Sequence, residues 1–199
     1  MSIYNIALFL HVSGAIGYFA GMGTWLFGFA AMRRAQRVEQ VRSLTNLTGQ
    51  LGPLFGISVL LILVTGLYMA VTAWRFQTGW IPVALVSLVL IAPLSTAFIE
   101  PRRRAIARLA QEASDGPLPQ ALQQRIHDPV LGTALQTVTI LLLGIVFLMT
   151  NKPALVSSLI VMAVALLLGL ASGLLVSRSG HNRGQSVAAS ADRMREPVR

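Results

Sequence analysis

The chain has 199 residues, 54 % of them hydrophobic and only 12 % charged, and it contains no cysteine. Without cysteine there can be no disulfide bond, no thiolate metal site and no cysteine nucleophile. A formal net charge of +9 would suggest nucleic-acid binding in a soluble protein. Here the basic residues alternate with long apolar runs, so we attribute the charge to membrane topology and expect no nucleic-acid partner.

Five apolar runs are long enough to cross a bilayer as helices, for which about 20 residues suffice. They cover residues 3–32, 51–74, 80–99, 130–150 and 153–176. The sequence therefore predicts an all-α fold, a polytopic membrane helical bundle with five transmembrane helices over residues 1–177. The first run is much longer than the apolar core of a signal peptide and has no basic residue before it, so we expect it to remain as a helix.

The first connecting segment, residues 33–50, is polar but carries a helical stripe of apolar residues. That stripe consists of Val38, Val41, Leu44 and Leu47. The spacing predicts a helix that lies along the inner membrane interface. Asn46 or Thr48 could cap the entry to the second span.

The later connections carry local signals of their own. Trp74 and Trp80 flank a short turn, as aromatic residues at a membrane–water interface do. Pro93 lies inside the third run, where it should kink the helix. Asp128 before Pro129 predicts an N-cap for the fourth span, because a carboxylate can accept hydrogen bonds from the free N–H groups of a first helical turn.

The basic residues gather on one side of this five-span pattern. All but two of the 16 Lys and Arg residues lie in segments 33–50, 100–129 and 177–199, and the exceptions are Arg75 and Lys152. Because Lys and Arg are retained in the cytoplasm, we predict a multi-pass membrane protein with an outside N-terminus and a cytoplasmic C-terminus. The basic segments should meet anionic lipid. Residues 178–199 are polar and without period, which predicts a disordered basic cytoplasmic tail.

The first span shows two seven-residue repeats, one of polar aromatic residues and one of small residues. The repeats are Tyr4, His11, Tyr18 and Trp25, and, offset by three, Ala7, Gly14, Gly21 and Gly28. Together they form one helix face with a ridge beside a groove. Such a face is typical of close helix packing. It would also admit a planar group such as haem or a quinone.

His11 is the only side chain within a predicted span that ionises near neutral pH, and such residues in membranes often serve a function. Met69 and Met162 lie at a similar depth in their own spans. A histidine–methionine pair can ligate haem iron, and the same atoms can hold Cu(I). We therefore consider a b-type haem site, or a copper site, in which His11 is the metal ligand and Met69 or Met162 a second ligand. Tyr4 and Tyr18 would line this pocket, and Gly14 and Gly21 would make room for the macrocycle. Alternatively, His11 is only hydrogen-bonded to a neighbouring helix.

Other polar residues indicate structural roles. No Asp, Glu, Lys or Arg lies in the middle of a span, so we expect no ion-coupled pump or carrier. Hydroxyls in the second span, Ser58, Thr65 and Thr72, are expected to join helices. Glu100 and Asp128 lie among arginines, which favours salt bridges over a metal site.

Several short motifs carry a resemblance to known families. They are His11 with the small residues after it, Leu63-Val64-Thr65-Gly66-Leu67, Trp80, and Leu148-Met149-Thr150-Asn151-Lys152-Pro153. Over most of residues 3–153 the chain resembles a family of bacterial predicted integral membrane proteins and, distantly, the CopD copper-resistance and HemJ proteins. This resemblance implies a location in the bacterial inner (plasma) membrane. The HemJ resemblance implies that His11 ligates haem and that the protein, if an enzyme, is a haem-linked membrane oxidoreductase acting on protoporphyrinogen. The lysine that the resemblance requires after Trp80 is replaced by Pro82 and Val83.

Three functional hypotheses follow. The first is a haem or copper site near the outer leaflet, built on the first helix. The second is a non-catalytic accessory or assembly subunit of a membrane complex, whose glycine-rich seam docks a partner helix or a second copy of the chain. A carrier for a small hydrophobic molecule is the third, suggested by the interrupted third span and the grooves of small residues.

Overall fold

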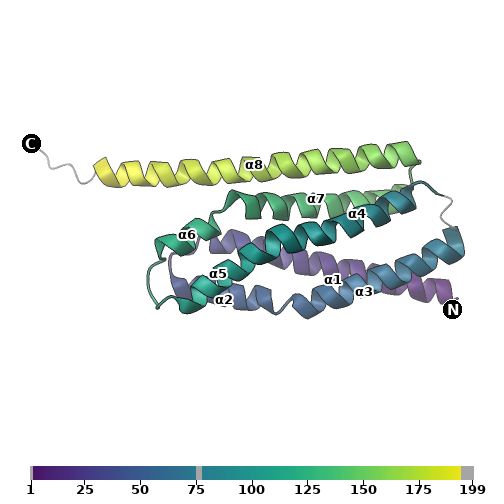
Figure 1. The fold of residues 1–199 in the computed structure, drawn as a ribbon, viewed down its shortest axis with the longest axis horizontal. Helices are drawn as coiled ribbons and strands as arrows, with labels where there is room; N and C mark the ends of the chain where they lie inside the picture. The colour runs from purple at the N-terminus through teal and green to yellow at the C-terminus, as the bar shows by residue number, and fades with distance from the viewer. Residues whose placement is uncertain (1, 75–77, 194–199) are drawn as a thin grey trace, which may run out of the picture.

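In the computed structural model, which describes residues 2–74 and 78–193 and the side chains as far as residue 175, every regular element is a helix (Figure 1). The long helices are α1 (Ile3–Met32), α3 (Gly52–Met69), α4 (Trp80–Leu94), α7 (Pro129–Asn151) and α8 (Leu155–Arg193). The shorter ones are α2 (Val38–Gly49), α5 (Glu100–Glu112) and α6 (Gln120–Ile126), with π-helical turns η1 (Ala70–Trp74) and η2 (Ser95–Ile99). Five of the helical segments are long and apolar enough to cross a membrane. The predicted all-α bundle is confirmed.

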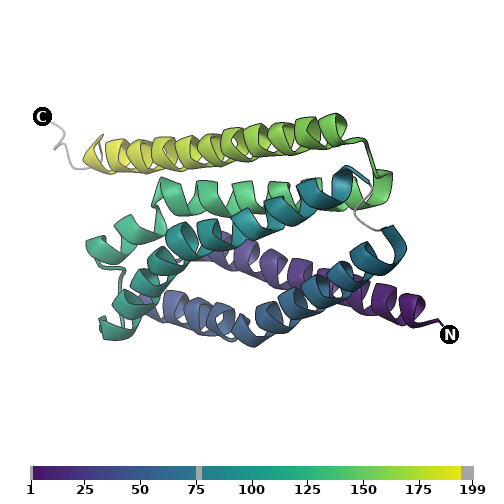
Figure 2. The same ribbon diagram turned by 45° about the vertical axis from the view of Figure 1, so that its right-hand side comes forward.

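The helices run roughly along one common axis, and the start of α1 and the end of α8 lie at opposite ends of the bundle (Figures 1 and 2). Helices α2, α5 and α6 gather at one end, which we call the basic end because it carries most of the described arginines. The start of α1 and the α7–α8 connection lie at the other end, which we call the N-terminal end. The tightest pairs are α1 with α3 and α7 with α8, and α4 packs on α7 and α8.

The α7–α8 pair is held by small residues on facing helices. A Cβ atom added at Gly169 would lie 2.7 Å from the Cα of Thr137, and one at Gly173 would lie 2.5 Å from the Cα of Thr133. The backbones therefore touch at these two points. In a bilayer, apolar surface is solvated by lipid as well as by protein, so close packing of this kind is what holds helices together.

Helix α2 packs on α5 at the basic end and confirms the helix predicted within segment 33–50. Val38 and Val41 are fully buried, whereas Leu47 of the predicted stripe is 53 % exposed. Arg42 ties the two helices by donating to the carbonyl oxygens of Ala110 (3.0 Å) and Ala113 (2.7 Å). The predicted cap by Asn46 or Thr48 is wrong, because α3 begins after Leu51 without a side-chain cap and the Thr48 hydroxyl donates to carbonyls within α2.

Proline and aspartate act in the structure much as their positions indicate. Pro93 lies inside α4, and the π-helical turn η2 begins two residues later, because proline has no N–H to continue the regular ladder. The N-cap at Asp128 is confirmed: its Oδ1 accepts from the backbone N–H of Val130 at 2.9 Å. Its Oδ2 accepts from Arg102 Nε at 2.9 Å, so the same carboxylate also joins α7 to α5.

The fifth span begins at Leu155 and its helix continues to Arg193. The backbone of α8 is thus helical through most of the segment for which the sequence predicts disorder, and residues 194–199 lie outside the described residues. Extending an existing helix is much easier than starting one, since each added residue gains a hydrogen bond without a new nucleation step.

Candidate functional site

The patterned face of α1 packs against the chain's own helices. A Cβ atom at Gly14 would lie 3.0 Å from Leu61 Cβ and 3.0 Å from the carbonyl oxygen of Ser58, both in α3. At Gly21 it would lie 3.0 Å from the ring of Phe55. Both glycines therefore contact α3 and border no open space. A partner helix that docked on this bundle would have to use another face.

His11 joins α1 to α3 through hydrogen bonds made by one ring nitrogen. Its Nδ1 lies 3.0 Å from the carbonyl oxygen of Ile62 and 3.3 Å from Thr65 Oγ1. The Thr65 hydroxyl donates its own proton to the carbonyl of Leu61. Because both neighbours of Nδ1 are acceptors, we assign the proton to Nδ1, which leaves a lone pair on Nε2.

The His11 ring lies directly against the backbone of α3 at Gly66. A Cβ atom there would come within 3.0 Å of His11 Cε1 and 3.2 Å of Nδ1, so a larger residue would displace the ring. The ring itself is partly exposed. Among the described residues none forms a hydrogen bond with His11 Nε2. The lone pair of this nitrogen can therefore coordinate a metal ion from outside the helix pair.

The two tyrosines share the α1 face with His11. The ring of Tyr18 packs edge-on against Phe55 with centroids 5.2 Å apart, and Phe55 packs in the same way on Trp25. Tyr4 is half-buried one heptad before His11, toward the N-terminal end. Tyr18 and Trp25 of the aromatic repeat thus pack on the same ring of α3.

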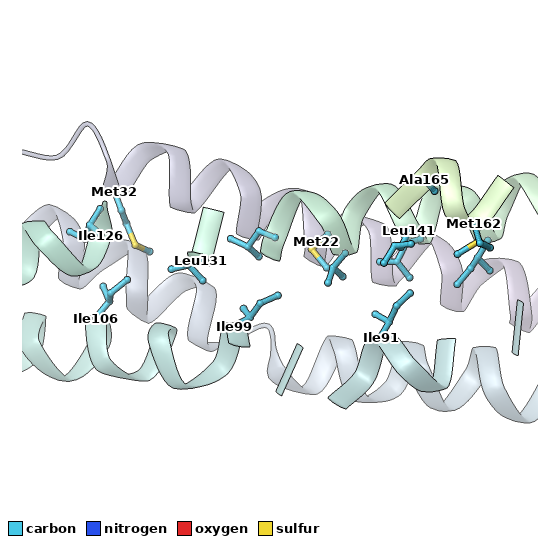
Figure 3. Close-up of a cluster of buried hydrophobic side chains, with 14 of the residues drawn as sticks. Met22, Met32, Ile91, Ile99, Ile106, Ile126, Leu131, Leu141, Met162 and Ala165 are labelled. Carbon is cyan, nitrogen blue, oxygen red and sulfur yellow. The ribbon is translucent and has the colours of Figure 1, made fainter. Parts of the chain in front are cut away.

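The two methionines lie in different parts of the bundle. Met69 is buried on α3, one helical turn after Thr65 and therefore on the face that meets α1. Met162 is on α8, where it packs toward α7: its Sδ lies 3.2 Å from the position of a Cβ at Gly144. Figure 3 shows Met162 beside Leu141 and Ala165 in the hydrophobic core. The structure therefore places Met69 in the same helix pair as His11 and Met162 in the other pair.

Charged side chains at the basic end pair with one another, as predicted. Glu100 accepts from both Arg103 and Arg104 at 2.7–2.8 Å. Within the residues that the structure describes, no group of three or more His, Cys, Asp or Glu side chains is arranged to hold a metal ion.

One cluster at this end was not predicted from the sequence. The guanidinium of Arg103, held by Glu100, lies 5.5 Å from the centroid of Trp25, whose Nε1 donates to the carbonyl of Thr48 at 3.1 Å. It joins α1, α2 and α5. Only the place of Trp25 in the heptad repeat pointed to it, because no local pattern relates residue 25 to residue 103.

A bundle of five helices that can each cross a bilayer, with charged residues gathered toward one end, defines a polytopic integral membrane protein. The chain belongs to the DUF2269 family of predicted integral membrane proteins, whose model matches residues 5–153. No curated protein and no solved structure matches the chain. The matched region includes His11 and all of the α3 residues around it. The likeness to the CopD and HemJ proteins stays a prediction.

Proposed function

We propose that this membrane protein binds a b-type haem through Nε2 of His11. The observation that supports the proposal is the hydrogen bond from Nδ1 to the Ile62 carbonyl, which orients the ring and places the lone pair on Nε2. Metal-ligating histidines generally donate their other ring N–H in this way, most often to a carbonyl or carboxylate. A bound haem would supply one-electron transfer, so any enzymatic activity would be that of a haem-linked membrane oxidoreductase.

The surrounding residues limit how the group would sit. Gly14 and Gly21 contact α3, so the macrocycle would lie outside the α1–α3 contact rather than in the glycine groove. Met69 belongs to the same helix pair as His11 but is buried on the face that meets α1, so it would have to turn out of that contact to act as a second ligand. Met162 belongs to the other helix pair and is the poorer candidate. Tyr4 and Tyr18 would border the site from α1. A Cu(I) ion held by the same imidazole and the Met69 thioether is the alternative occupant.

The ligand role can be separated from the structural role of His11 by one substitution. In the His11→Asn variant, the amide N–H can replace Nδ1–H and keep the bond to Ile62, but the ligand nitrogen is lost. We expect wild-type protein, expressed with ample haem and purified in detergent, to show a Soret band and sharp reduced bands. His11→Asn should fold and lack these bands, whereas His127→Asn, at an exposed histidine, should keep them. Colourless wild-type protein, or full haem content in His11→Asn, contradicts the proposal. Copper that is bound by the wild-type protein and absent from His11→Asn would favour the alternative.

We further propose that the N-terminal end faces outward, that the basic end lies in the cytoplasm of a bacterial inner membrane, and that it meets anionic lipid there. Support comes from the arginines of α2, α5 and α6, which lie together at one end of the bundle. This places His11, in the first third of α1, near the outer leaflet.

The orientation can be tested directly because the chain has no cysteine of its own. Single cysteines at two exposed positions, Asn5→Cys and Gln124→Cys, report on the two ends. A membrane-impermeant maleimide added to intact cells should label Asn5→Cys and leave Gln124→Cys unlabelled until the cells are opened. The reverse pattern would mean that the bundle is inserted the other way.

A further inference from the structure

The basic end carries an open groove where α1 meets α2. It has a volume of about 640 Å³ and is lined chiefly by Phe27, Ala30, Ala31, Arg34, Gln40 and Leu44. We infer that this groove, the Arg34 groove, binds one anionic phospholipid, with an acyl chain along α1 and the headgroup phosphate at Arg34. The inference rests on the proposal that the basic end meets anionic lipid, and it is independent of the haem site.

The apolar and polar parts of the groove follow each other along one helix. Phe27 is 80 % exposed and lies within the apolar run of α1, and Ala30 and Ala31 follow it with exposed, small side chains. Arg34 comes about 10 Å beyond Phe27, at about 1.5 Å per residue. This order, from hydrocarbon to cation, matches the order of groups along a phospholipid near the membrane interface.

The headgroup end of the groove carries two hydrogen-bond donors, Arg34 and Gln40, and none of the described carboxylates lines the groove. Arg34 is exposed and takes part in none of the ion pairs found among the described residues, whereas Arg37 and Arg42 pair with Glu39 and Asp115. The side-chain oxygen Oε1 of Gln40 accepts hydrogen bonds from the backbone N–H of Gln36 (3.0 Å) and of Arg37 (3.4 Å). These bonds orient the amide group, and its NH₂ donates to none of the described residues, so it can donate to an ester or phosphate oxygen.

Lipid is the occupant that this position favours. The lining from Phe27 to Ala31 belongs to a membrane-spanning helix, so the medium around it is acyl chains and headgroups. A guanidinium is well suited to phosphate, which it can contact through two parallel N–H groups. A zwitterionic headgroup would bring an ammonium group close to Arg34, so a net anionic headgroup should bind more tightly.

The test is native mass spectrometry of the delipidated full-length protein, titrated with phosphatidylglycerol or phosphatidylcholine of identical acyl chains. We expect wild-type protein to bind the first phosphatidylglycerol more tightly than phosphatidylcholine, by roughly fivefold, the factor for one Lys or Arg at an anionic surface. Arg34→Gln should lose this preference. Ala31→Leu, which fills the groove and keeps the charge, should weaken the first binding step for both lipids. Arg125→Gln is the control, because Arg125 is exposed at the same end but lies outside the groove.

The outcomes separate the groove from the general proposal. If Arg34→Gln and Arg125→Gln lower the preference equally, the basic end attracts anionic lipid but the groove is not the site, and the inference is overturned. An undiminished first binding step in Ala31→Leu overturns it as well. If wild-type protein does not distinguish the two lipids, the proposed contact with anionic lipid fails together with the inference.

Discussion

The Gly173→Leu variant is expected to be destabilised by about 3 kcal/mol, the upper end of the usual cost of overpacking. A Cβ atom at this position would lie 2.5 Å from the Cα of Thr133 and 2.9 Å from its Cβ. Backbone cannot move aside as the end of a flexible side chain can, so α7 and α8 would have to separate. Separation would also loosen the Gly169–Thr137 contact. Because lipid solvates the exposed surface, no hydrophobic force would restore the pair.

Ala171→Leu is the matched control for this variant. Ala171 is exposed on the same helix two residues earlier, so the same side chain should meet only lipid there and change stability by less than about 0.5 kcal/mol. Thermal unfolding in detergent, followed by circular dichroism, compares the two. Equal midpoints for Gly173→Leu and Ala171→Leu would mean that α8 does not pack on α7 through Gly173.

The number of apolar helices long enough to cross a membrane could be predicted, because such helices depend on a strong local signal, the length of an apolar run. The first run, 3–32, coincides with α1, and the second, 51–74, begins one residue before α3 and ends with η1. The fourth run, 130–150, differs from α7 by one residue at each end. Local signals at Pro93 and Asp128 were equally readable, because a missing N–H and a capping carboxylate act within one turn.

The choice of partner helix could not be predicted in the same way. In a soluble protein apolar residues point inward, but in a bilayer buried and lipid-facing positions are both apolar, so hydrophobicity does not distinguish them. Gly14 indicated that some helix would approach closely, but nothing in the sequence identified α3 as that helix. The sequence predicted that Met162 lies at the same depth as His11, but depth does not identify the neighbouring helix. In the structure Met162 packs against Gly144 of α7, within the α7–α8 pair.

The Gly66→Val variant is expected to lose the proposed haem although it leaves His11 and every other donor atom unchanged. A Cβ atom at position 66 would lie 3.0 Å from Cε1 of the His11 ring, and the two methyl groups of valine would reach further. The ring would have to leave the Ile62 carbonyl, and Nε2 would then no longer be held in a fixed direction. The absorption spectrum per mole of protein measures the loss of haem, and thermal unfolding measures the accompanying loss of stability, about 1–3 kcal/mol.

Gly56→Val separates this effect from the general cost of valine in place of glycine in α3. Nothing lies within 4 Å of a Cβ at Gly56, so the same change in the same helix carries the same helix propensity but displaces no neighbour. Gly56→Val should keep the absorption bands of reduced haem and the thermal stability of the wild-type protein. If Gly66→Val also keeps its bands, His11 does not bind haem from the position described. If Gly66→Val is destabilised while wild-type protein is colourless, the His11–Ile62 bond serves the packing of α1 on α3 alone.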